Sequence, residues 1–467
     1  MMEEFQDKGY WWLPSQPERK ISGTLKYHPV LGITLELMGS FRAMSDPKRK
    51  ETENIILGKT ANNREITLYK CYASGFSLSM GVGVSTSSYT AIALFVGYHF
   101  QAAEDVAFSS FSIGYYYLED WTGITGFALT HEKDGSGRFS KQVVTYSFPD
   151  KIVVDVGDLN ISINHRLQSG GNNLAEVSMK QVTYLKVTSQ KPVSFEEFND
   201  RINFLLHNFL SFGLGRATRP LFITATNENS KEQFPDGTLH DCEIEIYYGV
   251  NELPDVPKKV HPADMLFLLS DIRDSLDLCL NSWFLKGEIL RPVYELYFAN
   301  LNSSSMYLTH EFLNLTQALE SYHRRVAEGH YVDDQAFEDL YRSLLNSVPP
   351  SIPDNFKSAL KQRFKYLNEF SLRKRLGELI IKCSPMFLEF IKDSDTFIET
   401  VVATRNYLTH FDKKPIANVL HGEALYWVTR KLRVLLEICL MLEIGLSVKL
   451  INQLVNRNRQ MVFLGQK

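Results

Sequence analysis

The sequence predicts an α+β protein of several domains, with an N-terminal antiparallel β-sandwich-like domain followed by an all-α helical bundle. Apolar and polar residues alternate in many short runs over the first half, which is typical of strands. In the second half apolar residues recur every three or four positions, which is typical of amphipathic helices. A chain of 467 residues has the length for two or three domains and a sizeable core.

The predicted strands of the first half are separated by turns and interrupted by one helix. Asp134-Gly135-Ser136-Gly137 has the composition of a turn between two strands. Ser194 is followed three residues later by Glu197, a capping-box spacing that predicts the helix near 195–212. The alternating or short apolar runs that predict strands lie at 21–27, 33–37, 66–68, 92–95, 143–144, 152–156, 161–163, 221–224 and 243–248.

A proline-rich segment, Leu253–Pro262, predicts a linker because three prolines disfavour regular structure. It divides the chain into a β-rich domain at 1–258 and a helical domain at 263–467. Two helices of the second domain stand out. Leu308, Phe312, Leu315, Leu319 and Tyr322 form one apolar stripe of a helix near 307–328. A second helix, near 396–410, opens at a capping-box spacing of Thr396 and Glu399, and Pro415 ends it.

Charge and cysteine content indicate the general class of protein. The net charge is −4, but residues 291–467 carry +4 and the remainder −8, so the helical part is the better candidate for polyanion contact. Five scattered cysteines suit free thiols in a reducing compartment. The N-terminus lacks the features of a signal peptide, and no apolar run reaches 18 residues. We therefore expect a cytoplasmic location and no membrane contact.

Several common catalytic motifs are absent from the sequence. It contains no P-loop, no dinucleotide-binding glycine motif after a strand, no His-Glu-x-x-His and no Gly-x-Ser-x-Gly. These absences make an NTPase, a dinucleotide enzyme or a zinc hydrolase an unfavourable interpretation. No cluster with metal-ligand spacing is visible near the helix at 396–410. We therefore expect neither a metal nor a cofactor.

The most informative feature is Arg405, followed five residues later by His410, late in a predicted helix. Arginine is a permanent cation whose planar fork matches a phosphate, and histidine exchanges protons near neutral pH. Together they can cut RNA without a metal because the ribose 2′-OH supplies the nucleophile. Arg405 falls within an apolar stripe, so it needs a partner or a polar cleft, and Glu320 is a plausible partner. In an ideal helix the two motif residues lie about 140° apart.

The five-residue spacing of Arg405 and His410 also has explanations that involve no function. Composition predicts about half of one such pair by chance, and Arg325 with His330 is a second pair. Gly329 within it indicates a surface helix end. For Arg405 and His410 the alternative is a buried Arg–Glu pair beside an unrelated histidine at a helix end.

A basic segment between Lys357 and Arg375 also resembles a nucleic-acid-binding pattern. Phe356, Phe364, Tyr366 and Phe370 are interleaved with its cations, and rings that stack on bases beside cations for phosphates are typical of RNA-binding surfaces. The alternative is an ordinary solvated helix face. Glu369 is the one acidic residue there, and the basic ones are Lys357, Lys361, Arg363, Lys365, Arg373, Lys374 and Arg375.

Two segments resemble the signature helices of the ApeA-like HEPN family. They are Phe312–Arg324, FLNLTQALESYHR, and Thr404–Phe411, TRNYLTHF. The first half, with GITLEL at Gly32–Leu37 and with Trp121, resembles the β-rich domain that precedes the helices in that family. The resemblance covers nearly the whole chain. The paired helices carry it more specifically than the β-rich part does.

The resemblance implies a metal-independent endoribonuclease of anti-phage defence, acting by abortive infection. Arg405 and His410 match the fixed positions of the family's R-x4-H motif, and Asn406 matches its polar second position. Glu320 and His323 fall in the first signature helix, with supporting roles. Implied partners are RNA, such as tRNA or phage or host transcripts, a second copy in a homodimer or higher oligomer, and a phage-derived trigger at the N-terminal domain. The alternative is a non-catalytic nucleotide-binding or dimerisation module with a ligand-binding β domain.

Overall fold

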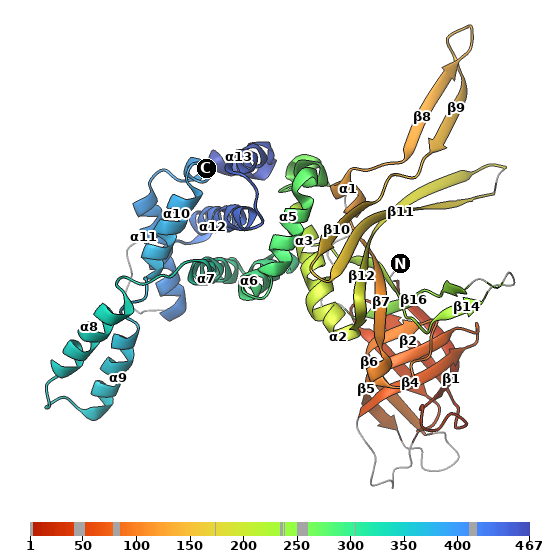
Figure 1. Ribbon diagram of the computed structural model, residues 1–467, viewed down its shortest axis with the longest axis horizontal. Helices are drawn as coiled ribbons and strands as arrows, with labels where there is room; N and C mark the ends of the chain where they lie inside the picture. The colour runs from red at the N-terminus through yellow and green to blue at the C-terminus, as the bar shows by residue number, and fades with distance from the viewer. Residues whose placement is uncertain are drawn as a thin grey trace. The chain divides into compact units, whose positions relative to one another are not determined.

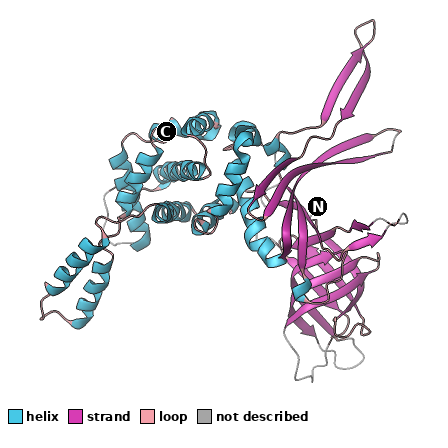
Figure 2. Cartoon of the chain, in the orientation of Figure 1, coloured by secondary structure: helices cyan, strands magenta, loops and turns pink. Residues whose placement is uncertain are grey.

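A computed structural model describes residues 3–41, 52–77, 85–172, 174–233, 237, 239–249, 260–303, 305–410 and 418–467. The chain divides into two compact units, Met1–Asp277 and Leu278–Lys467. The strands belong to the first unit, and the second is built from helices (Figures 1 and 2). The α+β class predicted from the sequence, with a β-rich part preceding a helical part, is confirmed.

Six strands of the first unit close into a barrel in which every neighbouring pair is antiparallel. The barrel closes because β6 pairs with both β3 and β5, and β5 carries a register shift between Ala73 and Gly75 of the kind that bends a strand. Its interior holds Trp11, Leu25, Leu35 and Leu94. The strands are β1 Phe5–Trp12, β2 Ile21–His28, β3 Gly32–Leu37, β4 Thr52–Thr60, β5 Glu65–Ser77 and β6 Thr86–Val96.

The barrel continues into an open antiparallel sheet, so the first unit differs from the two stacked layers of the expected sandwich. One edge of β6 pairs first with β3 and then with β16, and the order continues β16-β13-β7-β12-β11-β10. These strands are β7 Ala107–Tyr115, β10 Ile152–Val156, β11 Leu159–Gly171, β12 Val177–Ser194, β13 Pro220–Thr226 and β16 Ile244–Tyr248. Two hairpins are separate: β8 Phe127–Lys133 with β9 Phe139–Tyr146, and β14 Lys231–Gln233 with β15 Leu239–Asp241.

The helix predicted near 195–212 is present as three consecutive segments, and its cap is as expected. The Ser194 hydroxyl accepts the backbone N–H of Glu197 at 3.1 Å. The segments are α2 Phe195–Glu197, a π-helical stretch Phe198–Asn203 and α3 Phe204–Leu214. Two shorter helices of the unit are α1 Leu118–Thr122 and α4 Leu269–Ile272.

The division between the units lies between Asp277 and Leu278, later than the boundary predicted at 258–263. The later position follows from contacts that sequence patterns do not reveal. The indole N–H of Trp121 donates to the carbonyl of Phe267 at 3.0 Å, and the N–H of Phe267 donates to the carbonyl of Gly213 at 3.1 Å. Of the predicted linker Leu253–Pro262, residues 253–259 lie outside the described residues.

The second unit is a helical bundle (Figure 1). Its helix α12 buries most of its apolar side chains. Helices α8 and α9 form a hairpin that extends from the rest of this unit. None of the helices in the described ranges has the length and apolar character needed to cross a membrane. The helices are α5 Leu276–Leu285, which begins just before the division, α6 Arg291–Asn302, α7 Leu308–Val326, α8 Asp334–Asn346, α9 Asp354–Lys365, α10 Leu372–Cys383, α11 Ser394–His410, α12 Gly422–Glu443, α13 Val448–Arg457 and α14 Arg459–Gly465.

Candidate functional site

Helix α11 carries Arg405, Asn406 and His410 in its last two turns. It begins at Ser394, two residues before the predicted start, because the Asp393 carboxylate accepts the N–H of Thr396 at 2.7 Å. Val401, Thr404 and Leu408 are buried and fix the face that packs in the bundle. The described part of the helix ends at His410, and Pro415, the predicted stop, lies outside the described residues.

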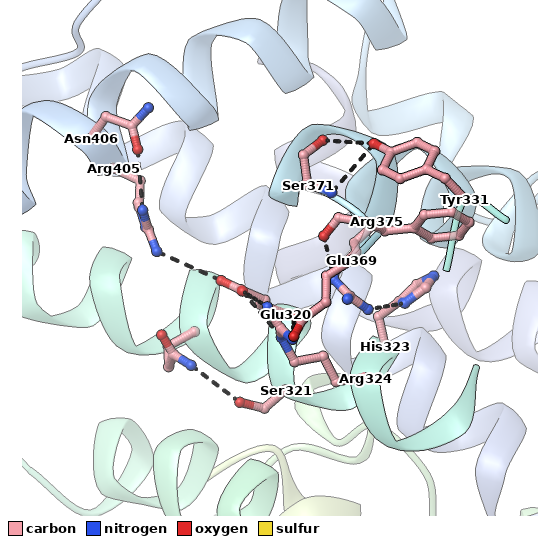
Figure 3. A network of polar contacts seen from close by, with 12 residues as sticks. Glu320, Ser321, His323, Arg324, Tyr331, Glu369, Ser371, Arg375, Arg405 and Asn406 are labelled. Carbon is pink, nitrogen blue, oxygen red and sulfur yellow. Dashed lines mark hydrogen bonds and ion pairs between the residues drawn. The ribbon is translucent and has the colours of Figure 1, made fainter. Parts of the chain in front are cut away.

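Arg405 lies at the surface of the bundle and is held at two points. Its side chain is 32% exposed, and Nη2 lies 3.7 Å from Oε2 of Glu320 on α7. Nη1 donates to Oδ1 of Asn406 at 3.2 Å. A guanidinium has five N–H donors, so these two contacts leave donors for an anion in solvent. The partnership with Glu320 that the sequence predicted is therefore present, and Figure 3 shows it.

Glu320 is shared between two arginines. Its side chain is 13% exposed and also accepts from Nη2 of Arg324 one turn later, at 3.1 Å. Arg324 forms a further close ion pair with Glu369, which precedes α10 (Figure 3). A carboxylate held between two guanidiniums keeps its orientation, which fixes the anchor for Arg405.

His410 is exposed at the end of α11. Across the described ranges its side chain has no hydrogen-bond or ion-pair partner, so the imidazole is accessible to a ligand. The buried Thr404 stabilises this end of the helix, because its hydroxyl accepts the N–H of Leu420 at 3.0 Å. Arg405 and His410 are thus both open to solvent, and they point about 140° apart if the helix is ideal.

Comparison with known families accounts for both units. A family model described as ApeA N-terminal domain 1 matches residues 8–283, and one described as Apea-like HEPN matches residues 313–450. The chain belongs to the ApeA-like HEPN family. The second match spans most of α7 and all of α11, the two helices that meet at Glu320 and Arg405. No curated protein and no solved structure matches the chain. The match to the HEPN domain supports the assignment of the chain to the nuclease-type proteins of anti-phage defence.

His323, predicted as a supporting site residue, is buried in the HEPN domain. It is 2% exposed, and its Nε2 lies 2.8 Å from the Glu378 carboxylate. Its Nδ1 lies 2.9 Å from Nη1 of Arg375. Because a guanidinium only donates, Nδ1 accepts and Nε2 carries the proton donated to Glu378. This histidine therefore joins α7 to α10 and cannot touch RNA in this structure.

The basic residues predicted to bind RNA separate into two groups. Arg375 is 2% exposed and donates to the carbonyl of Phe370, so its assignment to an RNA-contacting surface is wrong. Arg375 lies on the same buried face of α10 as Leu376 and Leu379, a position that its place in a basic segment did not indicate. The other six remain at least partly exposed: Lys357, Lys361, Arg363 and Lys365 on α9, and Arg373 and Lys374 on α10.

The pair Arg325 and His330 lies where the sequence placed it, at a helix end. Helix α7 stops at Val326, and Gly329 has a φ of 71°, which favours glycine. A side chain at Gly329 would also meet the Arg375 guanidinium. This pair therefore provides an internal comparison for the motif on α11.

Arg324 and Glu369 were not predicted as members of the site. The i, i+4 spacing of Glu320 and Arg324 on one helix could have indicated the first contact. Glu369 is the single acidic residue in the basic segment, which is a weaker signal. Their meeting depends on the loop between α9 and α10, which the sequence pattern does not define.

The buried histidine makes the stability of the protein depend on pH. Burial lowers the pKa of His323, and the positive charge of Arg375 lowers it further, although Glu378 opposes the shift. In the unfolded chain a histidine titrates near pH 6.5. Below that pH the unfolded state therefore binds a proton before the folded state does. This contribution to stability is complete above about pH 6.5 and is lost as the pH falls, by at most about 1.4 kcal/mol per pH unit.

His323→Gln is expected to remove this pH dependence while keeping a donor and an acceptor for Glu378 and Arg375. Urea denaturation of the two proteins at pH 7, 6 and 5 measures the difference in the free energy of unfolding. Wild type should lose stability relative to the variant as the pH falls. Curves that remain parallel over this range would show that His323 is protonated as easily in the folded chain as in the unfolded one.

Proposed function

We propose that the protein is a metal-independent endoribonuclease that cleaves RNA with Arg405 and His410. The observation that carries the proposal is the partial exposure of Arg405 and the full exposure of His410 at one end of α11, with Arg405 held by Glu320 and Asn406. An arginine buried in a closed ion pair would have favoured the alternative, a non-catalytic module. The guanidinium is partly exposed and has donors that these two contacts do not use, which instead supports phosphate binding.

Each residue has a distinct role in the proposed reaction. The ribose 2′-OH attacks the adjacent phosphorus, and the bond to the 5′-oxygen breaks. His410 takes the proton from the 2′-OH or supplies one to the leaving oxygen. Arg405 binds the phosphate oxygens and stabilises the charge that builds on them. Asn406 orients the guanidinium of Arg405, and Glu320 holds the same guanidinium in position. The products carry a 2′,3′-cyclic phosphate and a 5′-hydroxyl.

The six basic residues of α9 and α10 that are at least partly exposed extend the proposed RNA surface. Lys361, Arg363 and Lys365 are exposed on α9, and Tyr366 beside them is 64% exposed. Lysine and arginine would contact phosphates, and the ring would stack on a base. The RNA we propose as substrate is a tRNA or a phage or host transcript. The N-terminal domain would respond to a phage-derived trigger.

The site is proposed to be composite across a homodimer. The motif residues point in directions that differ by about 140° on an ideal helix, so one copy does not direct both at one phosphate. Two copies related by a two-fold axis would bring Arg405 of one chain near His410 of the other. The dimer would then hold two equivalent sites, each with one arginine and one histidine.

Mixing two inactive variants tests the composite site. Arg405→Ala and His410→Ala homodimers should each be inactive, but subunit exchange creates heterodimers in which one of the two sites retains both residues. An equal mixture is expected to recover about a quarter of the wild-type rate. The measurement is cleavage of labelled total RNA after exchange, with end analysis for the cyclic phosphate. If exchange is verified and no activity returns, the two residues act within one chain.

A further inference from the structure

The outer surface of the barrel in the first unit carries an open depression of about 710 Å³. It is formed by β1, β2 and β4, which are neighbours in the sheet (Figure 1). Its lining includes three lysines and two aromatic residues, and none of its lining residues is acidic. The residues that matter for the argument are Lys8, Tyr10, Trp12, Lys20 and Lys59.

The barrel core determines that these side chains face outward. Trp11 is fully buried inside the barrel, in space that Gly23 and Gly58 leave free, because a side chain at either position would collide with its indole. Successive residues of a strand point to opposite faces, so Lys8, Tyr10 and Trp12 lie on the outer face. Tyr10 pairs in register with Lys59 of β4, which places the ring beside an ammonium group.

The positive charge of the depression is not neutralised within the described residues. Neither Lys8, Lys20 nor Lys59 forms an ion pair there, whereas the outward-facing Lys26 of β2 pairs with Glu36 at 2.7 Å. Residues 1–290 carry a net charge of −8. Three unpaired lysines around one concavity in an acidic part of the chain therefore form a local anion-attracting surface.

The two aromatic residues have different environments. Tyr10 is 58% exposed, so its ring is accessible. Trp12 is 9% exposed, with the ammonium of Lys20 lying 5.1 Å from its ring centre and His99 packed edge-on against it. Trp12 thus holds Lys20 over the depression, and Tyr10 remains available as a stacking platform.

We propose that this depression binds single-stranded nucleic acid, with bases stacked on Tyr10 and phosphates at Lys8, Lys20 and Lys59. An exposed ring among unpaired cations is the combination by which such sites bind a strand. The depression is open, whereas a free nucleotide is normally enclosed by its pocket. A strand that makes several weak contacts is therefore the better fit. The proposal uses residues separate from Arg405 and His410 and does not depend on the nuclease activity.

Binding is best measured with a fluorescein-labelled oligothymidylate of about 12 nucleotides, within the range that such surfaces cover. DNA has no 2′-OH, so it cannot be cleaved by the mechanism proposed above. Tyr10→Ala should weaken binding roughly 5- to 100-fold, as expected for loss of base stacking. Lys8→Glu with Lys59→Glu should weaken it at least tenfold and should lower the slope of log affinity against log salt by about 1.4.

Matched controls are available in the same unit. Tyr72→Ala removes a tyrosine that is 46% exposed on β5 and does not line the depression. Lys151→Glu with Lys191→Glu makes the same charge change at two exposed lysines outside it. Neither control should reduce affinity by more than about twofold, since each leaves the lining intact.

Photo-crosslinking locates the bound strand independently. An oligonucleotide containing 4-thiothymidine should crosslink to the peptide that holds Tyr10 and Trp12. The assignment is overturned if the oligonucleotide does not bind, if control and test variants weaken binding equally, or if crosslinks map outside the lining of the depression. Saturation of the same site by thymidine monophosphate with the affinity of the oligonucleotide would also overturn the assignment to a strand.

Discussion

His410→Ala is expected to abolish RNA cleavage while leaving the fold intact. The imidazole is exposed at the end of α11 and supports no other side chain in the described ranges, so its removal should change the free energy of unfolding by within about ±0.5 kcal/mol. In the proposed mechanism the same group removes the proton from the 2′-OH, which is a poor nucleophile while protonated, or supplies a proton to the leaving oxygen. Loss of a proton-transferring group typically lowers the rate by about 10²–10⁴.

The chain contains its own control for this experiment. His330 is also exposed, lies five residues after an arginine and follows the end of a helix. His330→Ala should therefore cleave RNA at nearly the wild-type rate. Single-turnover cleavage of a labelled RNA, with thermal unfolding of each variant, separates chemistry from stability. If the His410→Ala protein cleaves RNA as fast as wild type, His410 has no role in the mechanism.

The parts of the fold that short sequence patterns determine were predictable. Alternation identified β2 and β3, and the apolar stripe identified α7 to within two residues. Closure of the barrel was not predictable, because it depends on β6 pairing with strands on both of its edges. The place where the two units divide depends on long-range contacts in the same way, since Phe267 joins the first unit through hydrogen bonds with Trp121 and Gly213.

The candidate site shows the same division between local and long-range information. The R-x4-H spacing and its helix can be read from the sequence, and the need for a partner for Arg405 correctly indicated Glu320. Burial was the missing information. Arg375 and His323 are residue types that often form functional surfaces, but the packing of α7 against α10 places both inside the bundle. The charge of a side chain does not show which face of its helix packs against neighbouring helices.

Arg405→Lys is expected to lower the cleavage rate by about 10²–10³, although it keeps the positive charge. Glu320 and Asn406 hold two nitrogens of a planar fork, and the remaining donors are free for a phosphate. A lysine has one compact ammonium group, which cannot keep both anchors and bind two phosphate oxygens at once. The loss should appear in the chemical step more than in RNA affinity, because the charge that attracts RNA is unchanged.

The matched substitution is Arg325→Lys, in the pair at the end of α7, which should leave the rate unchanged. Glu320→Gln should lower the rate less than Arg405→Lys does, since it loosens the guanidinium without replacing it. Single-turnover cleavage is measured for each protein with and without EDTA. Cleavage should persist in the chelator, because the proposed roles belong to protein side chains. Full activity of Arg405→Lys would show that Arg405 contributes only its positive charge. Loss of wild-type cleavage in EDTA would indicate a metal-dependent nuclease instead.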